Sequence, residues 1–170
     1  NKCSNNFTIV FRKHKKMILP IVAYGNPVLR KVGKEIESDY PGLKELIDDM
    51  FETMYAAPGV GLAAPQIGKD IRLFVIDSAY VLKKEEPTEE HETPADADDE
   101  VEDEFEGEEG IKKAFINAKM LNEYGKKWNY NEGCLSIPGI REDVERLGSI
   151  VIEYFDENFK KHTEEYTGFT

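Results

Sequence analysis

One stretch of this sequence has the periodicity of a helix, and the stretches after it have the composition of short strands. Apolar side chains recur three and four positions apart within residues 42–56, and Pro41 stands where a first helical turn tolerates proline. Short runs typical of strands lie at residues 72–77, 114–121, 144–146, 149–155 and 159–162. One helix followed by several short strands predicts an α+β fold, with antiparallel or mixed strands around a helix.

Turn signals separate these segments. Asn26-Pro27 predicts a turn, and we expect Leu29-Arg30 to open a short extended piece. Asp156-Glu157-Asn158 predicts a hairpin turn before the last strand.

The negative charge of the chain is concentrated in one segment. The net charge is -12, yet residues 83–109 hold fifteen Asp and Glu against two Lys, and the charges of the remaining residues nearly balance. This segment has little apolar surface to bury, so we expect a disordered acidic loop. So acidic a chain is not expected to bind nucleic acid. No apolar run approaches the roughly 18–20 residues of a membrane span, so no membrane partner is expected either.

The remaining sequence predicts one domain. We expect residues 1–16, with five basic and no acidic side chains, to form an unstructured basic leader, and residues 17–170 to form a domain interrupted by the acidic loop. Cys3 and Cys134 are far apart and fit no CxxC spacing, which favours a reducing compartment over a disulfide. The missing export signal favours the cytoplasm.

Two segments have unusual composition for a small domain. In Gly59-Val-Gly-Leu-Ala-Ala-Pro-Gln-Ile-Gly68, small side chains allow another backbone to approach closely, and Gln66 adds an amide that can donate to a carbonyl oxygen. In Asn131-Glu-Gly-Cys-Leu-Ser-Ile-Pro-Gly139, Gly133 leaves the Cys134 thiol accessible. A lone cysteine is most often a small buried residue, but as a thiolate it would bind zinc or ferrous iron strongly.

Together these segments resemble two signature motifs of the peptide deformylase family, GVGLAAPQIG at 59–68 and EGCLSIPG at 132–139. The stretches MILPIVAYGNPVLRK at 17–31 and FINAKML at 115–121 are also similar to that family, so the resemblance covers residues 17–170. It implies a metal-dependent hydrolase of protein biosynthesis, which processes the amino-terminal methionine. The family's reaction removes the formyl group from the formyl-methionine of nascent peptides near the ribosome, in the cytoplasm.

The resemblance also implies roles for individual residues. Cys134 would be one of three protein ligands of a divalent metal, Fe2+ or Zn2+, and a metal-bound water would attack the formyl carbon. The Gln66 side-chain amide and the Leu135 backbone N–H would stabilise the oxyanion.

Further positions would bind the substrate. Backbone groups around Gly59, Val60 and Gly61 would pair with it as a strand does. Glu132 and Arg141 match positions near the methionine side-chain pocket, where an ion pair between them would shape the wall.

A third family motif, His-Glu-x-x-His, is absent from these 170 residues. The histidines present are His14, His91 and His162, and none has that spacing, so we expect each to be an exposed surface residue. We therefore expect the family's carboxy-terminal metal-binding helix to be missing from this chain, and the chain to hold no metal by itself and to be inactive. Loss of that helix predicts a marginally stable fold with Ile150, Ile152 and Tyr154 uncovered.

Two other functions fit the same sequence. A non-catalytic relative of the deformylases would keep the cleft and bind peptide amino termini without hydrolysing them. Alternatively, the acidic loop at 83–109 would itself be the functional segment of an interaction protein, and deleting it would abolish function.

Overall fold

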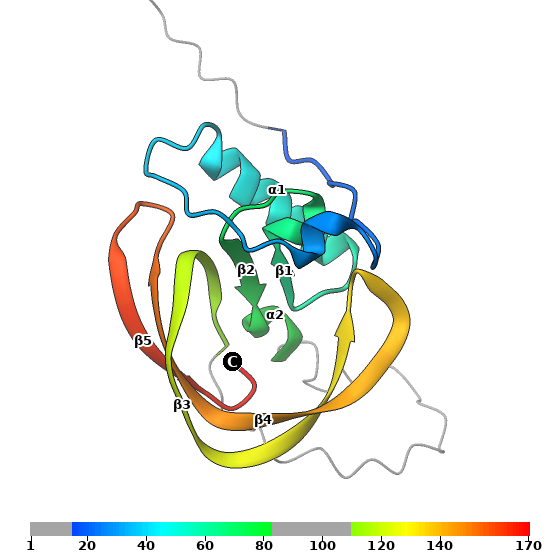
Figure 1. Ribbon diagram of the computed structural model, residues 1–170, viewed down its shortest axis with the longest axis vertical. Helices are drawn as coiled ribbons and strands as arrows, with labels where there is room; N and C mark the ends of the chain where they lie inside the picture. The colour runs from blue at the N-terminus through cyan, green and yellow to red at the C-terminus, as the bar shows by residue number, and fades with distance from the viewer. Residues whose placement is uncertain (1–14, 83–109) are drawn as a thin grey trace, which may run out of the picture.

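The computed structural model describes residues 15–82 and 110–170 (Figure 1). The basic leader, apart from its last two residues, and the whole acidic loop lie outside these ranges. The elements in chain order are η1 (Pro27–Arg30), α1 (Leu43–Ala56), β1 (Gly61–Ala63), η2 (Ala64–Ile67), β2 (Leu73–Asp77), α2 (Ser78–Leu82), β3 (Lys112–Cys134), β4 (Ile137–Phe155) and β5 (Lys161–Thr167). No helix within the described ranges is long and apolar enough to cross a membrane.

The strands form one five-stranded antiparallel sheet in the order β1-β2-β3-β4-β5. β3 and β4 pair along most of their length and make a long curved ribbon, which Figure 1 shows sweeping away from α1. Shifts in register interrupt their pairing at several points, and such bulges bend a strand pair. The sheet with α1 against it confirms the predicted α+β class.

The predicted elements are correct in type more often than in length. The helix expected over 42–56 is α1, and the turn at Asp156 lies between β4 and β5 as expected. The strand expected at 114–121 is only the first part of β3, and the two expected between 144 and 155 are one strand, β4. Much of the ribbon is exposed on both faces, so it has no apolar alternation from which its length could be predicted.

The extended piece predicted at Leu29-Arg30 is wrong. Those residues belong to η1, a turn of 3-10 helix. Asn26 Oδ1 accepts a hydrogen bond from Val28 N at 3.0 Å, and Pro27 occupies the first position, where its fixed φ suits a helical turn.

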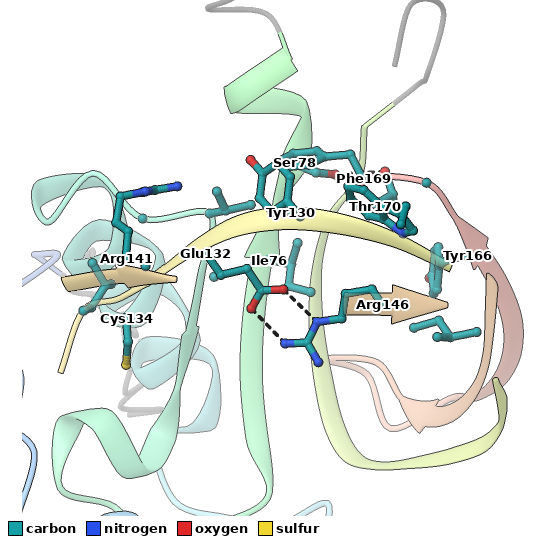
Figure 2. Close-up of a pocket in the computed structure, with 18 of the residues that line it drawn as sticks. Ile76, Ser78, Tyr130, Glu132, Cys134, Arg141, Arg146, Tyr166, Phe169 and Thr170 are labelled. Carbon is teal, nitrogen blue, oxygen red and sulfur yellow. Dashed lines mark hydrogen bonds and ion pairs between the residues drawn. The ribbon is translucent and has the colours of Figure 1, made fainter. Parts of the chain in front are cut away.

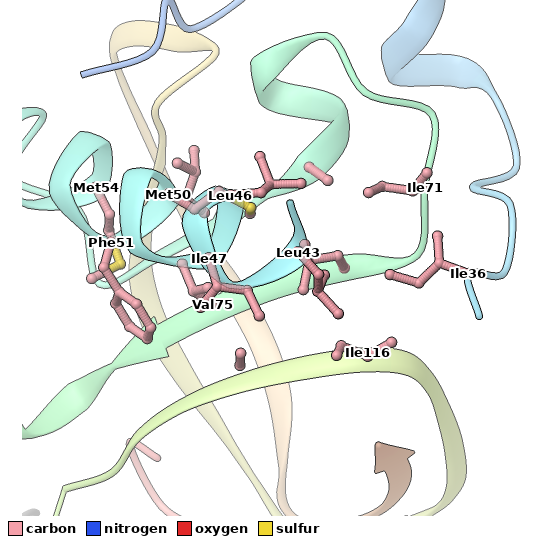
Figure 3. Packing of buried hydrophobic residues seen from close by; sticks show 14 residues of the cluster. Ile36, Leu43, Leu46, Ile47, Met50, Phe51, Met54, Ile71, Val75 and Ile116 are labelled. Carbon is pink, nitrogen blue, oxygen red and sulfur yellow. The ribbon is translucent and has the colours of Figure 1, made fainter. Parts of the chain in front are cut away.

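The main core lies between α1 and the β1–β2 end of the sheet. Met50 and Met54 of α1 are fully buried, and Figure 3 shows the apolar face of α1 packed over Val75 of β2 and Ile116 of β3. Burial of side chains of this size stabilises the fold by about 1.5–3 kcal/mol each.

Two buried polar residues on α1 attach the segment that precedes η1. Asp49 Oδ1 accepts a hydrogen bond from Met17 N, and Thr53 Oγ1 accepts one from Leu19 N, both at 2.8 Å. The Thr53 hydroxyl donates in turn to the Asp49 carbonyl at 2.7 Å. The segment is therefore attached to the helix through groups that have few water molecules to compete for them.

Asn117 attaches the next segment to the sheet. Its side chain accepts from Ile36 N at 3.0 Å and donates to Ile36 O at 2.8 Å, as a neighbouring strand would. Its φ of 51° lies in the left-handed region, which asparagine tolerates better than most residues, and it falls in the first register shift of β3.

A second, smaller core lies on the ribbon side of the sheet, and it overturns part of the sequence prediction. Ile152 and Tyr154, expected to be uncovered, are 6% and 2% exposed. The Tyr154 ring packs 4.4 Å from that of Phe115, centre to centre, and the Tyr166 ring of β5 meets Phe115 edge-on at 6.0 Å. β3 and β5 supply the cover that the prediction assigned to a further helix. Ile150 is half-buried.

A polar network borders this second core. Lys113 Nζ lies 2.6 Å from Glu164 Oε2, which also accepts from the Tyr154 and Tyr166 hydroxyls. Burial alone would raise the pKa of Glu164, but these hydrogen bonds outweigh it and lower the pKa to about 2. The carboxylate is therefore charged across the physiological range.

Replacement of Thr53 by valine tests the attachment of the amino-terminal segment. Thr53→Val keeps the shape of the side chain but leaves Leu19 N–H without its acceptor, so we expect the free energy of unfolding to fall by about 1–3 kcal/mol. Urea unfolding followed by circular dichroism measures this, with Lys44→Ala at an exposed position of the same helix as the control. A loss below about 0.5 kcal/mol in Thr53→Val would contradict the assignment.

Candidate functional site

The two unusual segments meet in space. Cys134 ends β3, and Leu135 and Ser136 form the two-residue turn before β4. Gln66 lies in η2, and its Nε2 is 4.0 Å from Cys134 Sγ and 3.5 Å from Ser136 Oγ. The thiol is exposed, as expected from its glycine neighbour. The grouping of Gln66, Cys134 and Leu135 that the sequence predicted is therefore present, whereas the oxyanion role of Gln66 and Leu135 and the metal-ligand role of Cys134 stay predictions.

Glycines allow the loop before β1 to lie close to this turn. A Cβ on Gly59 would be 2.8 Å from Leu135 Cδ1 and 3.4 Å from Met54 Cγ, and a Cβ on Gly61 would be 3.3 Å from the Val75 carbonyl oxygen. The close contact at Gly61 is with a backbone atom of β2 and that at Gly59 is with side chains, whereas the approach of a bound peptide strand stays a prediction. The Val60 carbonyl already accepts a hydrogen bond from Asp77 N at 2.9 Å.

A cavity of about 1070 Å³ adjoins this meeting point. Its wall includes the 57–61 loop, the Cys134 turn, the inner face of the β3–β4 ribbon and the last residues of the chain. Figure 2 shows the side chains of Tyr130, Glu132 and Arg146 on the ribbon, with Cys134 toward one end of it. A volume of this size accommodates several residues of a peptide or a small molecule.

The ion pair of this wall differs from the one that the sequence predicted. Arg146 donates to both carboxylate oxygens of Glu132, at 2.7 and 2.8 Å (Figure 2). Arg141 instead donates from Nε to Asn131 Oδ1 at 2.6 Å.

The register of the ribbon explains this choice of arginine. Side chains alternate between faces along a strand, so Glu132 and Trp128 share the face of β3 that borders the cavity. Arg146 lies opposite Trp128, whereas Arg141 lies opposite Gly133, which is out of phase with Glu132. The hydrogen bonds from Arg146 lower the pKa of Glu132, against a smaller effect of burial that raises it.

Aromatic rings form another part of the wall. The Trp128 and Tyr130 rings lie 5.4 Å apart, and Phe169 meets Tyr130 edge-on at the same separation. The sequence reasoning did not identify these residues as part of the site, nor Arg146. Residues 128, 130 and 132 are spaced two apart ahead of the cysteine motif, and that spacing would have placed them on one strand face if β3 had been predicted to its full length.

The described residues do not by themselves fit a catalytic metal. No group of three His, Cys, Asp or Glu side chains able to hold a metal ion occurs within 15–82 and 110–170. His162, expected to be exposed, is half-buried: its Nε2 lies 2.8 Å from Asp156 Oδ2 and its ring stacks on Tyr154. The other two histidines lie outside the described ranges. Cys134, the ligand that the sequence predicted, lies in the wall of the cavity with its thiol exposed.

The fold and the site define a class of protein, a domain with a curved antiparallel sheet whose cavity has a cysteine thiol and a glutamine carboxamide at its rim. The family model of polypeptide deformylases matches residues 18–170, and the chain belongs to that family. A peptide deformylase of Flavobacterium psychrophilum is 55% identical over 152 residues, which cover 89% of this chain and 72% of the relative. One of Christiangramia forsetii is 51% identical over 154 residues, covering 89% of this chain and 71% of the relative.

Solved structures give the same result. The crystal structure of the peptide deformylase from Thermus thermophilus is 35% identical with a TM-score of 0.68, and the match covers 90% of this chain and 74% of that one. The structure of a peptide deformylase from Legionella pneumophila is 30% identical with a TM-score of 0.67, covering 89% and 73%.

The arginine that pairs with Glu132 can be identified by titration. We expect Arg146→Met to raise the pKa of Glu132 because it removes both hydrogen bonds to the carboxylate, and Arg141→Met to leave that pKa unchanged. Carbon-13 chemical shifts of labelled glutamate side chains, followed against pH, report this directly. The reverse pattern would restore the pair expected from the sequence.

Proposed function

We propose that this protein has the function of a metal-dependent peptide deformylase, which hydrolyses the formyl group from the amino-terminal formyl-methionine of newly made proteins in the cytoplasm, but that its 170 residues alone lack part of the catalytic machinery. The observation that supports this most directly is the convergence of the Gln66 carboxamide and the exposed Cys134 thiol from two separate loops at the rim of one cavity. An amide N–H aimed at a reacting carbonyl oxygen is a typical oxyanion donor, worth roughly 3–4 kcal/mol when well placed. The Leu135 backbone N–H is proposed as the second donor.

The substrate is proposed to lie against the Gly59–Gly61 loop and the cavity. β1 is at the edge of the sheet, where it pairs with β2, and an edge strand can bind an extended peptide through its other side. The apolar and aromatic part of the cavity suits a methionine side chain, and the Glu132–Arg146 pair stiffens the wall beside it. Arg141, which does not belong to this ion pair, also lines the cavity and is still proposed to bind substrate.

Cys134 is proposed as a metal ligand, and its thiolate suits iron and zinc alike. The family's reaction needs three protein ligands and a general base, which its His-Glu-x-x-His motif supplies, and that motif is not among these 170 residues. We therefore propose that this chain by itself does not hold a catalytic metal and does not turn over substrate. The residues proposed above to bind formyl-methionyl peptides do not belong to that motif and are present in this chain.

Hydrolysis of a formyl-methionyl tripeptide tests the function in two proteins. We expect no hydrolysis above background by the 170-residue chain with Fe2+ or Zn2+ added. We expect activity from the same chain joined at its carboxyl end to a family segment that carries His-Glu-x-x-His. In that extended protein, Gln66→Ala should lower kcat/KM by about 100- to 1000-fold, the loss typical of one oxyanion donor.

Controls separate the possible outcomes. Cys134→Ala in the extended protein should abolish both metal content and activity, whereas Lys44→Ala, remote on α1, should change neither. Turnover by the 170-residue chain would contradict its proposed inactivity. A folded, metal-loaded extended protein without activity would contradict the deformylase function, and peptide binding without turnover would then favour the non-catalytic binder.

A further inference from the structure

The orientation of the Gln66 carboxamide follows from one backbone contact. Ala63 N–H donates to Gln66 Oε1 at 2.9 Å. A backbone N–H needs an acceptor, so the oxygen end of the amide must face Ala63 and the NH2 end must face away from it. That NH2 group points to the turn formed by residues 134–136.

Ser136 is the buried group that the NH2 meets there. The residue is 4% exposed, and its Oγ lies 3.5 Å from Gln66 Nε2. A hydroxyl oxygen is an acceptor for one of the two N–H bonds, and the other is then directed toward the rim of the cavity, where Cys134 Sγ lies 4.0 Å from Nε2. Hydrogen bonds at both ends of the amide restrict its rotation.

The backbones of the two loops are held together as well. Val22 N donates to the Gln66 carbonyl and Tyr24 N donates to the Ser136 carbonyl, both at 2.8 Å. Residues 22–24 therefore bridge the two loops. Because this bridge sets the distance between the loop backbones, the Ser136 hydroxyl has a defined place relative to the Gln66 side chain.

We propose that Ser136 is a positioning residue: its hydroxyl holds the Gln66 carboxamide with one N–H directed into the cavity. This inference rests on the proposed function for the task that it gives Gln66, but the contact itself does not depend on turnover. Without the hydroxyl, the amide keeps its bond to Ala63 and gains freedom to rotate the NH2 group away from a substrate oxygen.

Nuclear magnetic resonance can observe this contact without interference, because Gln66 is the one glutamine of the sequence. Selective labelling with ¹⁵N-glutamine gives a single side-chain NH2 signal in the 170-residue chain. In Ser136→Ala we expect that signal to shift toward the values of free glutamine, and its exchange with solvent to rise about two- to fivefold, the factor for a weak net hydrogen bond. In Ser38→Ala, an exposed serine before α1, we expect no change.

An unchanged Gln66 signal and exchange rate in folded Ser136→Ala would overturn the proposal. If Ser136→Ala fails to fold, the wild-type chain still decides: a nuclear Overhauser effect between the Gln66 NH2 protons and the Ser136 β-protons supports the contact, and its absence refutes it. Neither measurement uses catalysis. A failure of the deformylase proposal would therefore appear in the activity assay and leave this result standing.

Discussion

The packing of α1 on the β1–β2 end of the sheet is the constraint on which the site depends. Met50 and Met54 face the sheet without exposure to solvent, so α1 has little freedom to slide or rotate. The end of the helix then fixes the position of the next loop, because Gly59 N donates to the Met54 carbonyl at 3.0 Å. The loop that approaches Leu135 is thus attached directly to Met54, which is fully buried.

The second half of the site comes from the middle of the sheet order, where β3 turns into β4. The β3–β4 ribbon carries Cys134 in its terminal turn, and its curvature returns that turn to the loop that follows α1. Two elements distant in sequence meet there, and the segment at 22–24 joins them through backbone hydrogen bonds that no side chain specifies. The amino-terminal segment therefore has a structural task at the site in addition to covering α1.

Sequence reasoning succeeded where residue type alone fixes the physics. The apolar residues of α1 recur at helical spacing, so they form one face of the helix, and that face is buried. Small residues at 59 and 61 leave room for a neighbouring segment of chain in any fold. Sequence reasoning failed where a strand is exposed on both faces, because such a strand has no alternation of apolar and polar residues. The outer ribbon between Tyr124 and Arg146 is polar or half-buried on both faces, so its strands were predicted as fragments.

The sequence by itself determined the fold class, the family resemblance and the residues Gln66, Cys134 and Leu135 as one group. The tertiary structure decided how those residues are held: that Arg146 and not Arg141 pairs with Glu132, that Tyr154 is covered by its own sheet, and that Ser136 contacts Gln66. The reason is that a motif specifies chemistry over a few adjacent residues. Partners across strands depend instead on register and curvature, which arise only when the whole sheet is paired.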